Sequence, residues 1–158
     1  MMMRIQEPEE FIYTDLKAKQ NTEQRDFMSR KFLIESKTDT VQWKLTGNQK
    51  TLLGYVCMEA ELNGSDKKTL AWFTPMIPVS SGPDGYTGLP GLILYMDIDE
   101  GKTLIEAKSV EMKAVDAKIM VKPKEGKKVS VSEFRKIRED KMKEMNQGGG
   151  NIIIIRSN

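Results

Sequence analysis

The residue types that most often carry chemistry are scarce in this chain, which has one cysteine and no histidine. Without histidine, the chain cannot assemble a Ser-His-Asp or Cys-His nucleophile, a histidine-rich zinc site or a histidine proton shuttle. The single thiol, Cys57, also excludes an internal disulfide framework. We therefore expect no catalytic constellation, no metal site and no cofactor. For Cys57 we favour packing in a strand, because free cysteine is among the most buried residue types.

A serine and several carboxylates are the remaining candidates for chemistry. Ser65 and Lys68 have the Ser-x-x-Lys spacing that acyl enzymes use on a helix, but here they fall in a predicted turn between strands. Asp97, Asp99 and Glu100 lie together, yet their intervals do not match a calcium loop. Solvated turns are the better interpretation of both groups.

Aromatic residues near a glycine-rich stretch provide the strongest binding candidate. Residues 80–91 contain four glycines and two prolines, a density that favours several tight turns with positive φ. A backbone with few side chains allows close approach, so neighbouring aromatic rings could line a concave surface. The predicted ligand or partner surface consists of Tyr55, Trp72, Phe73 and Tyr86. Core packing is the alternative for each ring, since aromatic residues in strands are commonly buried.

The residues around these candidates predict one mainly β domain, a single curved antiparallel sheet or half-barrel of about eight strands, with a minor α component. Alternating apolar residues and turn signals mark the strands. The predicted strands are 10–13, 31–35, 41–46, 52–62, 70–79, 92–98, 103–113 and 117–121. We expect hairpins of 31–35 with 41–46 and of 92–98 with 103–113, and a turn at 47–50. Residues 1–30 form a poorly patterned segment, mostly loop, and residues 31–158 form the β domain.

One helix is predicted at about 131–146. Ser130 and Glu133 have the spacing of a capping box. Val129 and Phe134 occupy the positions of a hydrophobic staple, and apolar residues then recur at helical spacing. These independent signals agree on where the helix begins.

Charge and hydropathy exclude two classes of partner. The chain has 25 basic and 23 acidic residues, mostly interspersed, so we expect no nucleic acid to be bound. The lysines between 118 and 128 are followed by acidic residues and read as a solvated face. No segment reaches the roughly 20 apolar residues of a transmembrane helix, and no signal peptide is visible. The apolar run Ile152–Ile155 predicts a buried central strand.

The run Gly88-Leu89-Pro90-Gly91-Leu92-Ile93 predicts a type II turn at 89–92, with proline at the second position and glycine at the third. This run resembles the signature of the GLPGLI family of the Bacteroidota. The flanking segments agree with the family pattern in order and spacing: Trp43–Leu45, Gly54–Cys57, Ala60, Ala71–Thr74, Ile77–Pro78 and Gly82–Pro83. The resemblance covers roughly residues 30–155.

The resemblance implies a small exported protein of the periplasm or outer membrane, mostly antiparallel β, whose activity is not established. It also implies a relation to the bowl-like module found ahead of some bacterial N-glycanases. Members usually begin with a signal peptide and further strands that are not visible here, so export rests on the resemblance alone and the N-terminus could be shortened. The family pattern also has cysteine at Cys57, and Asp39-Thr40-Val41 resembles an O-glycosylation site of exported proteins in this group. Cys57 and Thr40 are therefore candidates for modification.

These features favour a non-enzymatic binding or accessory domain of the cell envelope, acting through the aromatic surface near Trp72 and Tyr86 on a protein or glycan partner. One alternative is a structural subunit of a larger outer-membrane assembly, signalled by a long exposed edge strand. A less favoured alternative is a hydrolase with Asp84 or Asp97 as general base. That alternative requires two acids facing one pocket.

Overall fold

A computed structural model describes residues 10–38 and 41–148 of the chain, which are mainly β with one C-terminal helix, as the sequence predicts. The predicted strand at Ile152–Ile155 and the candidate Thr40 lie outside these residues. The strands are β1 (Glu10–Asp15), β2 (Gln20–Phe27), β3 (Arg30–Lys37), β4 (Trp43–Leu52), β5 (Tyr55–Leu62), β6 (Thr69–Thr74), β7 (Leu92–Ile98), β8 (Thr103–Glu106) and β9 (Lys127–Ser130). A 3-10 turn, η1 (Pro83–Gly85), follows β6, and the helix α1 (Val131–Gln147) follows β9.

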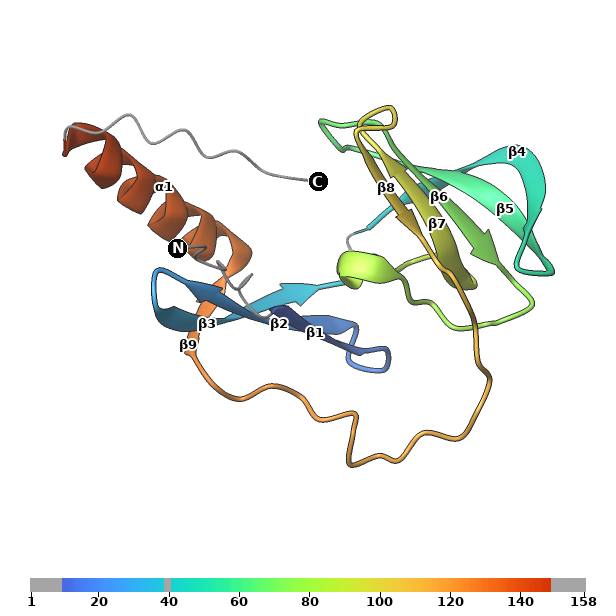
Figure 1. The fold of residues 1–158 in the computed structure, drawn as a ribbon, viewed down its shortest axis with the longest axis horizontal. Helices are drawn as coiled ribbons and strands as arrows, with labels where there is room; N and C mark the ends of the chain where they lie inside the picture. Colours follow the sequence, from blue (N-terminus) through green and yellow to red (C-terminus); the bar gives the residue numbers. More distant parts are fainter. Residues whose placement is uncertain (1–9, 39–40, 149–158) are drawn as a thin grey trace, which may run out of the picture. The chain divides into compact units, whose positions relative to one another are not determined.

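The strands form two sheets, where the sequence predicted one. Their orders are β1-β2-β3-β9 and β4-β5-β6-β7-β8 (Figure 1). The expected hairpin of 31–35 with 41–46 does not form, because β3 pairs in parallel with β9, which lies about 90 residues later in the chain. The described residues divide into two compact units: residues 10–13, 21–36 and 122–148 form one, and Thr14–Gln20 with Lys37–Val121 form the other. Local alternation cannot predict which of two sheets a strand joins.

The four-stranded sheet contains β1, which the sequence predicted at 10–13, and β2, which lies in a stretch predicted to be mostly loop. β2 reads Gln-Asn-Thr-Glu-Gln-Arg-Asp-Phe, so it carries almost no apolar alternation. Its Arg25 forms an ion pair with Glu10 of β1, across the strand pair, and a second one with Glu23 of β2 itself. The loop prediction for this segment was wrong because cross-strand pairing of charges replaced the hydrophobic signal.

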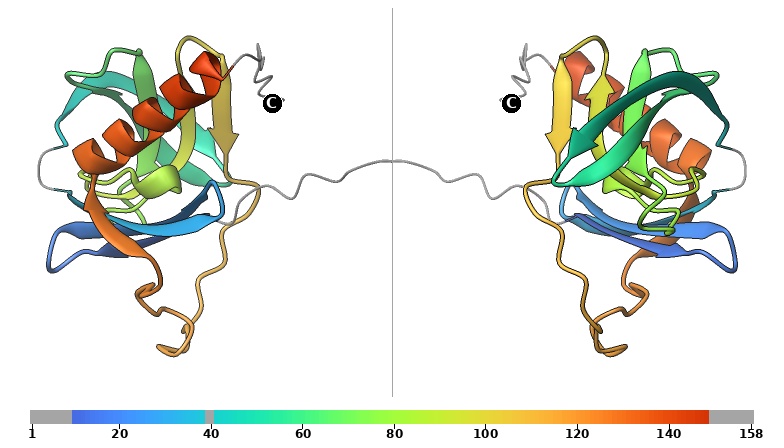
Figure 2. Two further views of the ribbon diagram at one scale, coloured as in Figure 1. Left: turned by 90° about the vertical axis from the view of Figure 1, so that its left-hand side faces the viewer. Right: turned by 90° about the vertical axis from the view of Figure 1, so that its right-hand side faces the viewer.

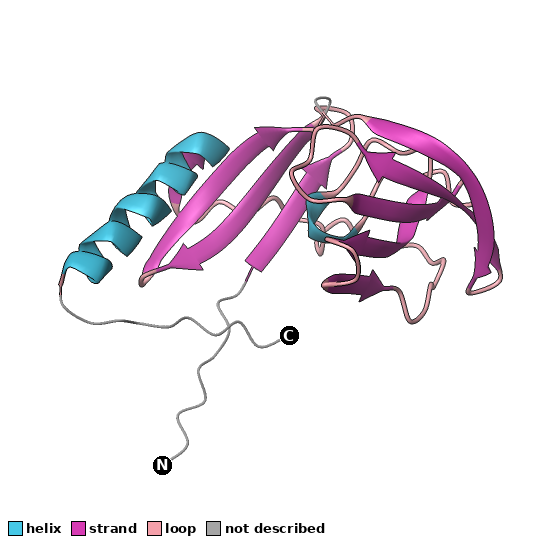
Figure 3. Cartoon of the chain, turned by 90° about the horizontal axis from the view of Figure 1, so that it is seen from above, coloured by secondary structure: helices cyan, strands magenta, loops and turns pink. Residues whose placement is uncertain are grey.

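The helix α1 begins where the capping signals predicted. The backbone N–H of Glu133 donates to Ser130 Oγ at 3.1 Å, and Glu133 Oε2 accepts from the Ser130 N–H at 2.7 Å. Phe134 is buried and makes edge-on ring contacts with Phe27 and Phe32, at 6.0 and 5.3 Å between centroids. Figure 3 shows α1 alongside the strands of this sheet. One aromatic side chain of α1 therefore anchors the helix to its sheet.

The five-stranded sheet is an antiparallel meander in which each strand pairs with the next along the chain. The β4–β5 hairpin turns at Leu53 and Gly54, which both have positive φ (51° and 79°), as the right-handed strand twist favours. The turn predicted at 47–50 lies inside β4, where the register shifts between Leu45 and Gln49 and the strand bends (Figure 1). Glycine at 47 therefore marks an irregularity within a strand.

β6 leaves the sheet just before Pro75, as predicted from the missing proline N–H. The second predicted hairpin forms with β7 and β8, but β8 ends at Glu106, whereas the sequence predicted a strand to residue 113. The strand predicted at 117–121 is also absent, and Figure 2 shows the chain between β8 and β9 as an open loop. Apolar and polar residues alternate in these segments as they do in strands, but in the described chain no partner strand lies beside them.

Candidate functional site: an aromatic row on the five-stranded sheet

The Gly88–Ile93 motif shapes the backbone. Gly88 has a φ of +97°, which favours glycine. A Cβ on Gly91 would collide with the carbonyl oxygen of Thr74, so glycine lets β7 begin directly against the end of β6. Gly91 is not among the described residues with positive φ, so the predicted type II turn was wrong. Leu89 is buried, and the motif as a whole positions core residues.

Tyr86 belongs to the packing around this motif. Trp43 Nε1 donates a hydrogen bond to the carbonyl oxygen of Thr87 at 2.8 Å, and the rings of Trp43 and Tyr86 meet edge-on at 6.2 Å. Burial, and then the nearby Asp84 carboxylate, raise the pKa of the Tyr86 hydroxyl. Tyr86 therefore presents a neutral phenol against the core.

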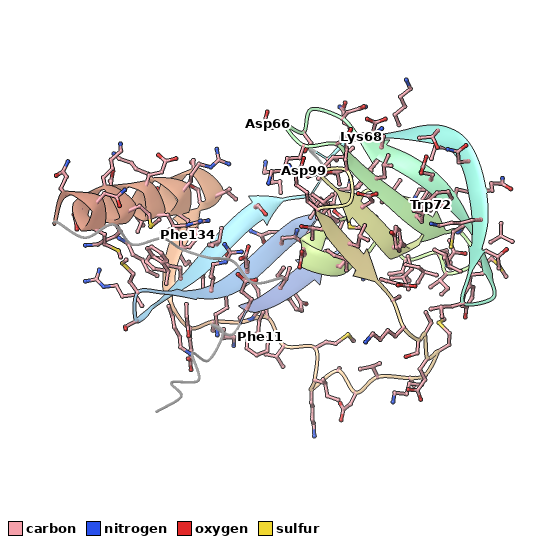
Figure 4. The ribbon with its side chains drawn as sticks, turned by 45° about the horizontal axis from the view of Figure 1, so that its top comes forward. Phe11, Asp66, Lys68, Trp72, Asp99 and Phe134 are labelled. Carbon is pink, nitrogen blue, oxygen red and sulfur yellow. The ribbon has the colours of Figure 1, made fainter. Side chains whose placement is uncertain are left out.

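The two faces of the sheet separate the four aromatic residues predicted to form one surface. Phe73 is 1% exposed and lies in the main core cluster, against which Tyr86 also packs. Trp72 precedes Phe73 in β6, so its ring points to the opposite face, where Figure 4 labels it. Tyr55 and Glu59 are four residues apart in β5, so their side chains share a face, and Glu59 lies opposite Trp72. The structure thus brings Tyr55 and Trp72 to one face and places Phe73 and Tyr86 on the other.

A straight row of four side chains crosses the face that carries Trp72. Glu59 of β5 lies opposite Trp72, Trp72 opposite Tyr95 of β7, and Tyr95 opposite Glu106 of β8. Directly opposed residues share a face and have Cβ atoms about 5 Å apart. We call Glu59, Trp72, Tyr95 and Glu106 the aromatic row. It places two half-buried rings side by side, with a carboxylate at each end.

Lys50 reaches over this row from β4. Its ammonium lies 4.1 Å from the centroid of the Trp72 ring and 4.3 Å from that of Tyr95. Both distances lie within the range of a cation–π interaction, so the two rings hold one ammonium together. The aromatic row therefore combines apolar ring surface with a donor carrying three N–H groups.

Glu59 is an almost buried carboxylate with defined partners. It is 9% exposed, and Oε1 accepts hydrogen bonds from Thr46 Oγ1 at 2.8 Å and Asn48 Nδ2 at 2.9 Å. Thr46 and Asn48 come from the irregular part of β4, so the bend in that strand delivers the two donors. The bend thus fixes one end of the aromatic row.

The sequence signal for this row was weak. Glu59, Tyr95 and Glu106 each sit at ordinary alternating positions of strands, and Lys50 lies in a stretch predicted to be a turn. What joins them is the pairing register, which depends on the shift in β7 that leaves Leu94 without an opposite residue. Alternation in β5 to β8 indicated the face, but not the neighbours across strands.

Cys57 lies on the same face and is fully buried. Burial raises the pKa of its thiol, and this outweighs the lowering by a hydrogen bond with the Leu52 backbone and by the Lys50 charge. A thiol with a raised pKa is a poor nucleophile at neutral pH. Its position agrees with the packing role favoured from the sequence.

The acidic loop at one end of the sheet is held by local contacts. Asp97 Oδ1 accepts from the Gly101 N–H at 2.7 Å, and Lys102 donates to Asp99 at 2.9 Å, which lowers the pKa of the Asp99 carboxyl. Figure 4 shows Asp66, Lys68 and Asp99 together at this end. Within residues 10–38 and 41–148, no group of three or more acidic or cysteine side chains is arranged to hold a metal.

Among the hollows lined by described residues, two lie at the five-stranded sheet. An apolar one of about 410 Å³ lies between Gly82, Leu94 and Ile105 and reaches Val110. A smaller one of about 230 Å³ is lined by Lys68, Leu70, Asp97 and Glu100. Of these two hollows, only the smaller is lined by two acids, as the hydrolase alternative requires, and one of them is the candidate base Asp97. The other candidate base, Asp84, is exposed in the turn η1.

Comparison with known proteins finds one matching family model and solved structures with a similar fold. The model of a family described as a protein of unknown function (Porph_ging) matches residues 63–95, which include Trp72, the Gly88–Ile93 motif and Tyr95. No curated protein is similar to the chain. In the described residues, no helix is long and apolar enough to cross a membrane.

Two crystal structures of PNGF-II, in space groups C2 and P21, share the fold. Each has a TM-score of 0.65, with 19% and 20% sequence identity, and the match covers 84% and 85% of this chain. The chain spans about a quarter of the length of PNGF-II, since the match covers 25% of that chain in both crystal forms. At this identity the similarity concerns the fold alone.

Proposed function

We propose that the chain is a non-enzymatic binding module of the bacterial cell envelope that takes a saccharide on the aromatic row. The observation that carries the proposal is the pair of adjacent rings, Trp72 and Tyr95, with a carboxylate at each end and the Lys50 ammonium over both rings. Rings with a few placed polar groups are the usual composition of a small-molecule site.

A saccharide fits both kinds of group in this row. One face of a pyranose ring presents C–H groups that stack on aromatic rings, and its rim presents hydroxyls. The Lys50 ammonium can donate to these hydroxyls, and the exposed Glu106 carboxylate can accept from them. The buried Glu59 carboxylate already accepts hydrogen bonds from Thr46 and Asn48, so its role is to hold the end of the aromatic row in place.

The envelope assignment, and membership of the GLPGLI family, are supported by the resemblance of the Gly88–Ile93 motif and its flanks. The family-model match over residues 63–95 and the fold shared with PNGF-II are compatible with it. In PNGF-II a similar fold makes up about a quarter of the chain, which supports the interpretation as a module.

Calorimetric titration with two probe sets, N-glycans released from a glycoprotein and peptidoglycan fragments, tests the proposal. Trp72→Ala and Tyr95→Ala should each weaken binding by about tenfold or more, because each removes a ring at the centre of the site. Leu104→Ala is the matched control, since Leu104 lies on the same face in the neighbouring row and is exposed.

Two results would count against the proposal. A wild-type chain that binds neither probe set would remove the saccharide assignment. Binding that survives Trp72→Ala and Tyr95→Ala together would move the site away from the aromatic row. The circular dichroism spectrum of the double variant must match that of the wild type, so that a change in binding does not reflect unfolding.

A carboxylate hydrolase is the second candidate, and the small hollow that contains Asp97 and Glu100 favours it. It predicts that hydrolysis of the same probes is lost in Asp97→Asn and kept in Glu106→Gln. If the wild type releases no product during the titrations, this candidate is excluded for those probes.

A further inference from the structure

The Lys50 side chain lies on the surface that a ligand of the aromatic row would use. Its ammonium is 4.1 Å from the centroid of the Trp72 ring and 4.3 Å from that of Tyr95. At these distances the ammonium is in contact with both rings, so no ligand atom fits between it and either ring. A sugar that stacks on these ring faces must therefore first displace Lys50.

The two rings are what holds this ammonium in place. β5 separates β4, which carries Lys50, from Trp72 in β6, so the side chain extends across the sheet to reach the rings. No acid of the described residues forms an ion pair with Lys50. A cation–π contact at a partly exposed site gives only about a two- to fivefold preference for the occupied state. A ligand can therefore displace the side chain at little cost.

The charges around the rings favour a cation at this position. The aromatic row ends in the carboxylates of Glu59 and Glu106, and the faces of the two rings between them have a negative electrostatic potential. When Lys50 moves away, these negative groups lose the cation that compensates them. A neutral ligand leaves them uncompensated, whereas a ligand with its own ammonium replaces the lost charge.

We propose that the position over Trp72 and Tyr95 is a cation site, which Lys50 fills in the free protein and the protonated amine of a non-acetylated amino sugar fills in the complex. The inference rests on the proposed function and narrows the ligand from saccharides in general to those with a free ammonium group. Aromatic rings are a recurrent means of binding ammonium ligands. The displaced Lys50 ammonium, on its flexible four-carbon stem, can then donate to hydroxyls at the rim of the sugar.

An acidic saccharide is the alternative ligand, with its carboxylate paired to a Lys50 ammonium that stays on the rings. That carboxylate would lie between those of Glu59 and Glu106, which repel it. The two ligands also make opposite predictions for the removal of Lys50. An acidic saccharide needs the ammonium, whereas an amino sugar competes with it.

NMR titration of the whole chain with two oligosaccharides of equal length tests the inference. One is an oligomer of glucosamine, at a pH at which its amines are protonated, and the other is the same oligomer with every amine acetylated. The chain has two tryptophans, so the indole N–H of Trp72 reports binding and that of Trp43 is an internal control. The wild type should bind the glucosamine oligomer about tenfold or more tightly than the acetylated one, and the Trp72 signal should shift.

Substitutions of Lys50 separate the two ligand classes. Lys50→Ala removes the internal competitor, so it should bind the glucosamine oligomer about two- to fivefold more tightly than the wild type. Lys50→Arg is the matched control and should bind no more tightly than the wild type, because arginine keeps a cation that stacks on aromatic faces. Weaker binding by a Lys50→Ala variant with a wild-type amide spectrum would overturn the inference. Preference of the wild type for an oligomer of galacturonic acid, lost in Lys50→Ala, would overturn it in favour of the acidic ligand.

A second pair of variants separates the site from general attraction of a cationic oligomer. Glu106→Gln should weaken binding of the glucosamine oligomer about threefold or more, because it removes the exposed carboxylate at one end of the aromatic row. Glu139→Gln, the same substitution at an exposed position of α1, should bind like the wild type. Equal weakening in both variants would mean that the oligomer binds through net charge alone, and the inference would be wrong.

Failure of this inference and failure of the proposed function give different results. If both oligomers shift the Trp72 signal with equal affinity, the saccharide site stands and the cation site is overturned. If neither oligomer shifts it but tetramethylammonium does, the cation site stands and the saccharide assignment is overturned. If none of the three probes shifts it, both proposals are wrong.

Discussion

Two neighbouring aromatic residues of β6 have opposite surroundings. Phe73 is almost fully buried among Ala71, Ile93 and Met96, on the face that the Gly88–Ile93 motif covers. Trp72 is half-buried on the other face, beside Tyr95. The first face is closed by apolar packing, whereas the second is organised by an ammonium and two carboxylates.

The contrast separates what holds the sheet together from what it can bind. Ala71, Phe73 and Met96 on the closed face are almost fully buried, so substitutions of these residues should change stability. Trp72, Tyr95 and Glu106 of the aromatic row retain accessible surface, so substitutions of these residues should change binding with less loss of stability. Substitutions on each face test this division, taken here from the largest expected effect to the smallest.

Phe73→Ala should have the largest effect on stability. It removes a buried ring and leaves a cavity, which costs about 3 to 5 kcal/mol in comparable cores. Urea denaturation should therefore show a much lower midpoint, whereas Trp72→Ala should lose less than half as much free energy. Equal losses for the two variants would contradict the division between the faces.

Gly91→Ala should destabilise the chain by about 2 to 3 kcal/mol, because the new methyl group meets the backbone of Thr74, which cannot move independently. Gly101→Ala is the matched control: nothing lies within 4 Å of its Cβ position, and the loss should reflect only its φ of +86°. Thermal denaturation of both variants measures the difference. If Gly101→Ala proves the more damaging, close approach is not what Gly91 provides.

Lys50→Met should cost only about 0.5 to 1 kcal/mol, since the substitution keeps most of the apolar stem and removes the charge over the rings. The fluorescence of Trp72 should change. The fluorescence of Trp43, which is hydrogen-bonded to the Thr87 carbonyl on the core side, should stay the same. Single-tryptophan versions of the chain distinguish the two signals. An unchanged Trp72 signal would mean that the ammonium does not rest on the ring.

The smallest effect concerns the Cys57 thiol. Burial raises its pKa, so as pH rises through the ordinary thiol value of about 8.5 the unfolded chain loses its proton first. The corresponding stability is present below that pH and is lost as pH rises through the folded-state pKa. Unfolding free energies should therefore fall between neutral and alkaline pH more in the wild type than in Cys57→Ala. Identical pH profiles would show that the thiol is not desolvated.

The sequence predicted much of the fold, but little of the site. The helix start at Ser130, the hairpin of β7 with β8 and the exit of β6 before Pro75 depend on local signals, and all three are observed. The strand at 10–13 was predicted and is observed as β1, whereas β2 was missed because its residues are almost all polar and carry no apolar alternation. For the candidate surface, the sequence identified Trp72 and Tyr55, which share a face, but grouped them with Phe73 and Tyr86, which lie on the other face.

The amino-acid sequence alone determined that the chain is mainly β with one C-terminal helix, because alternation, capping residues and prolines act within a few residues. It also excluded histidine-dependent chemistry. Only the tertiary structure decided that the strands divide between two sheets and that Glu59, Trp72, Tyr95 and Glu106 form a row. It also shows that, within residues 10–38 and 41–148, the segment after β8 pairs with no strand. Strand order and register depend on which distant segments pair, and that choice is made by packing and charge across strands rather than by any local pattern.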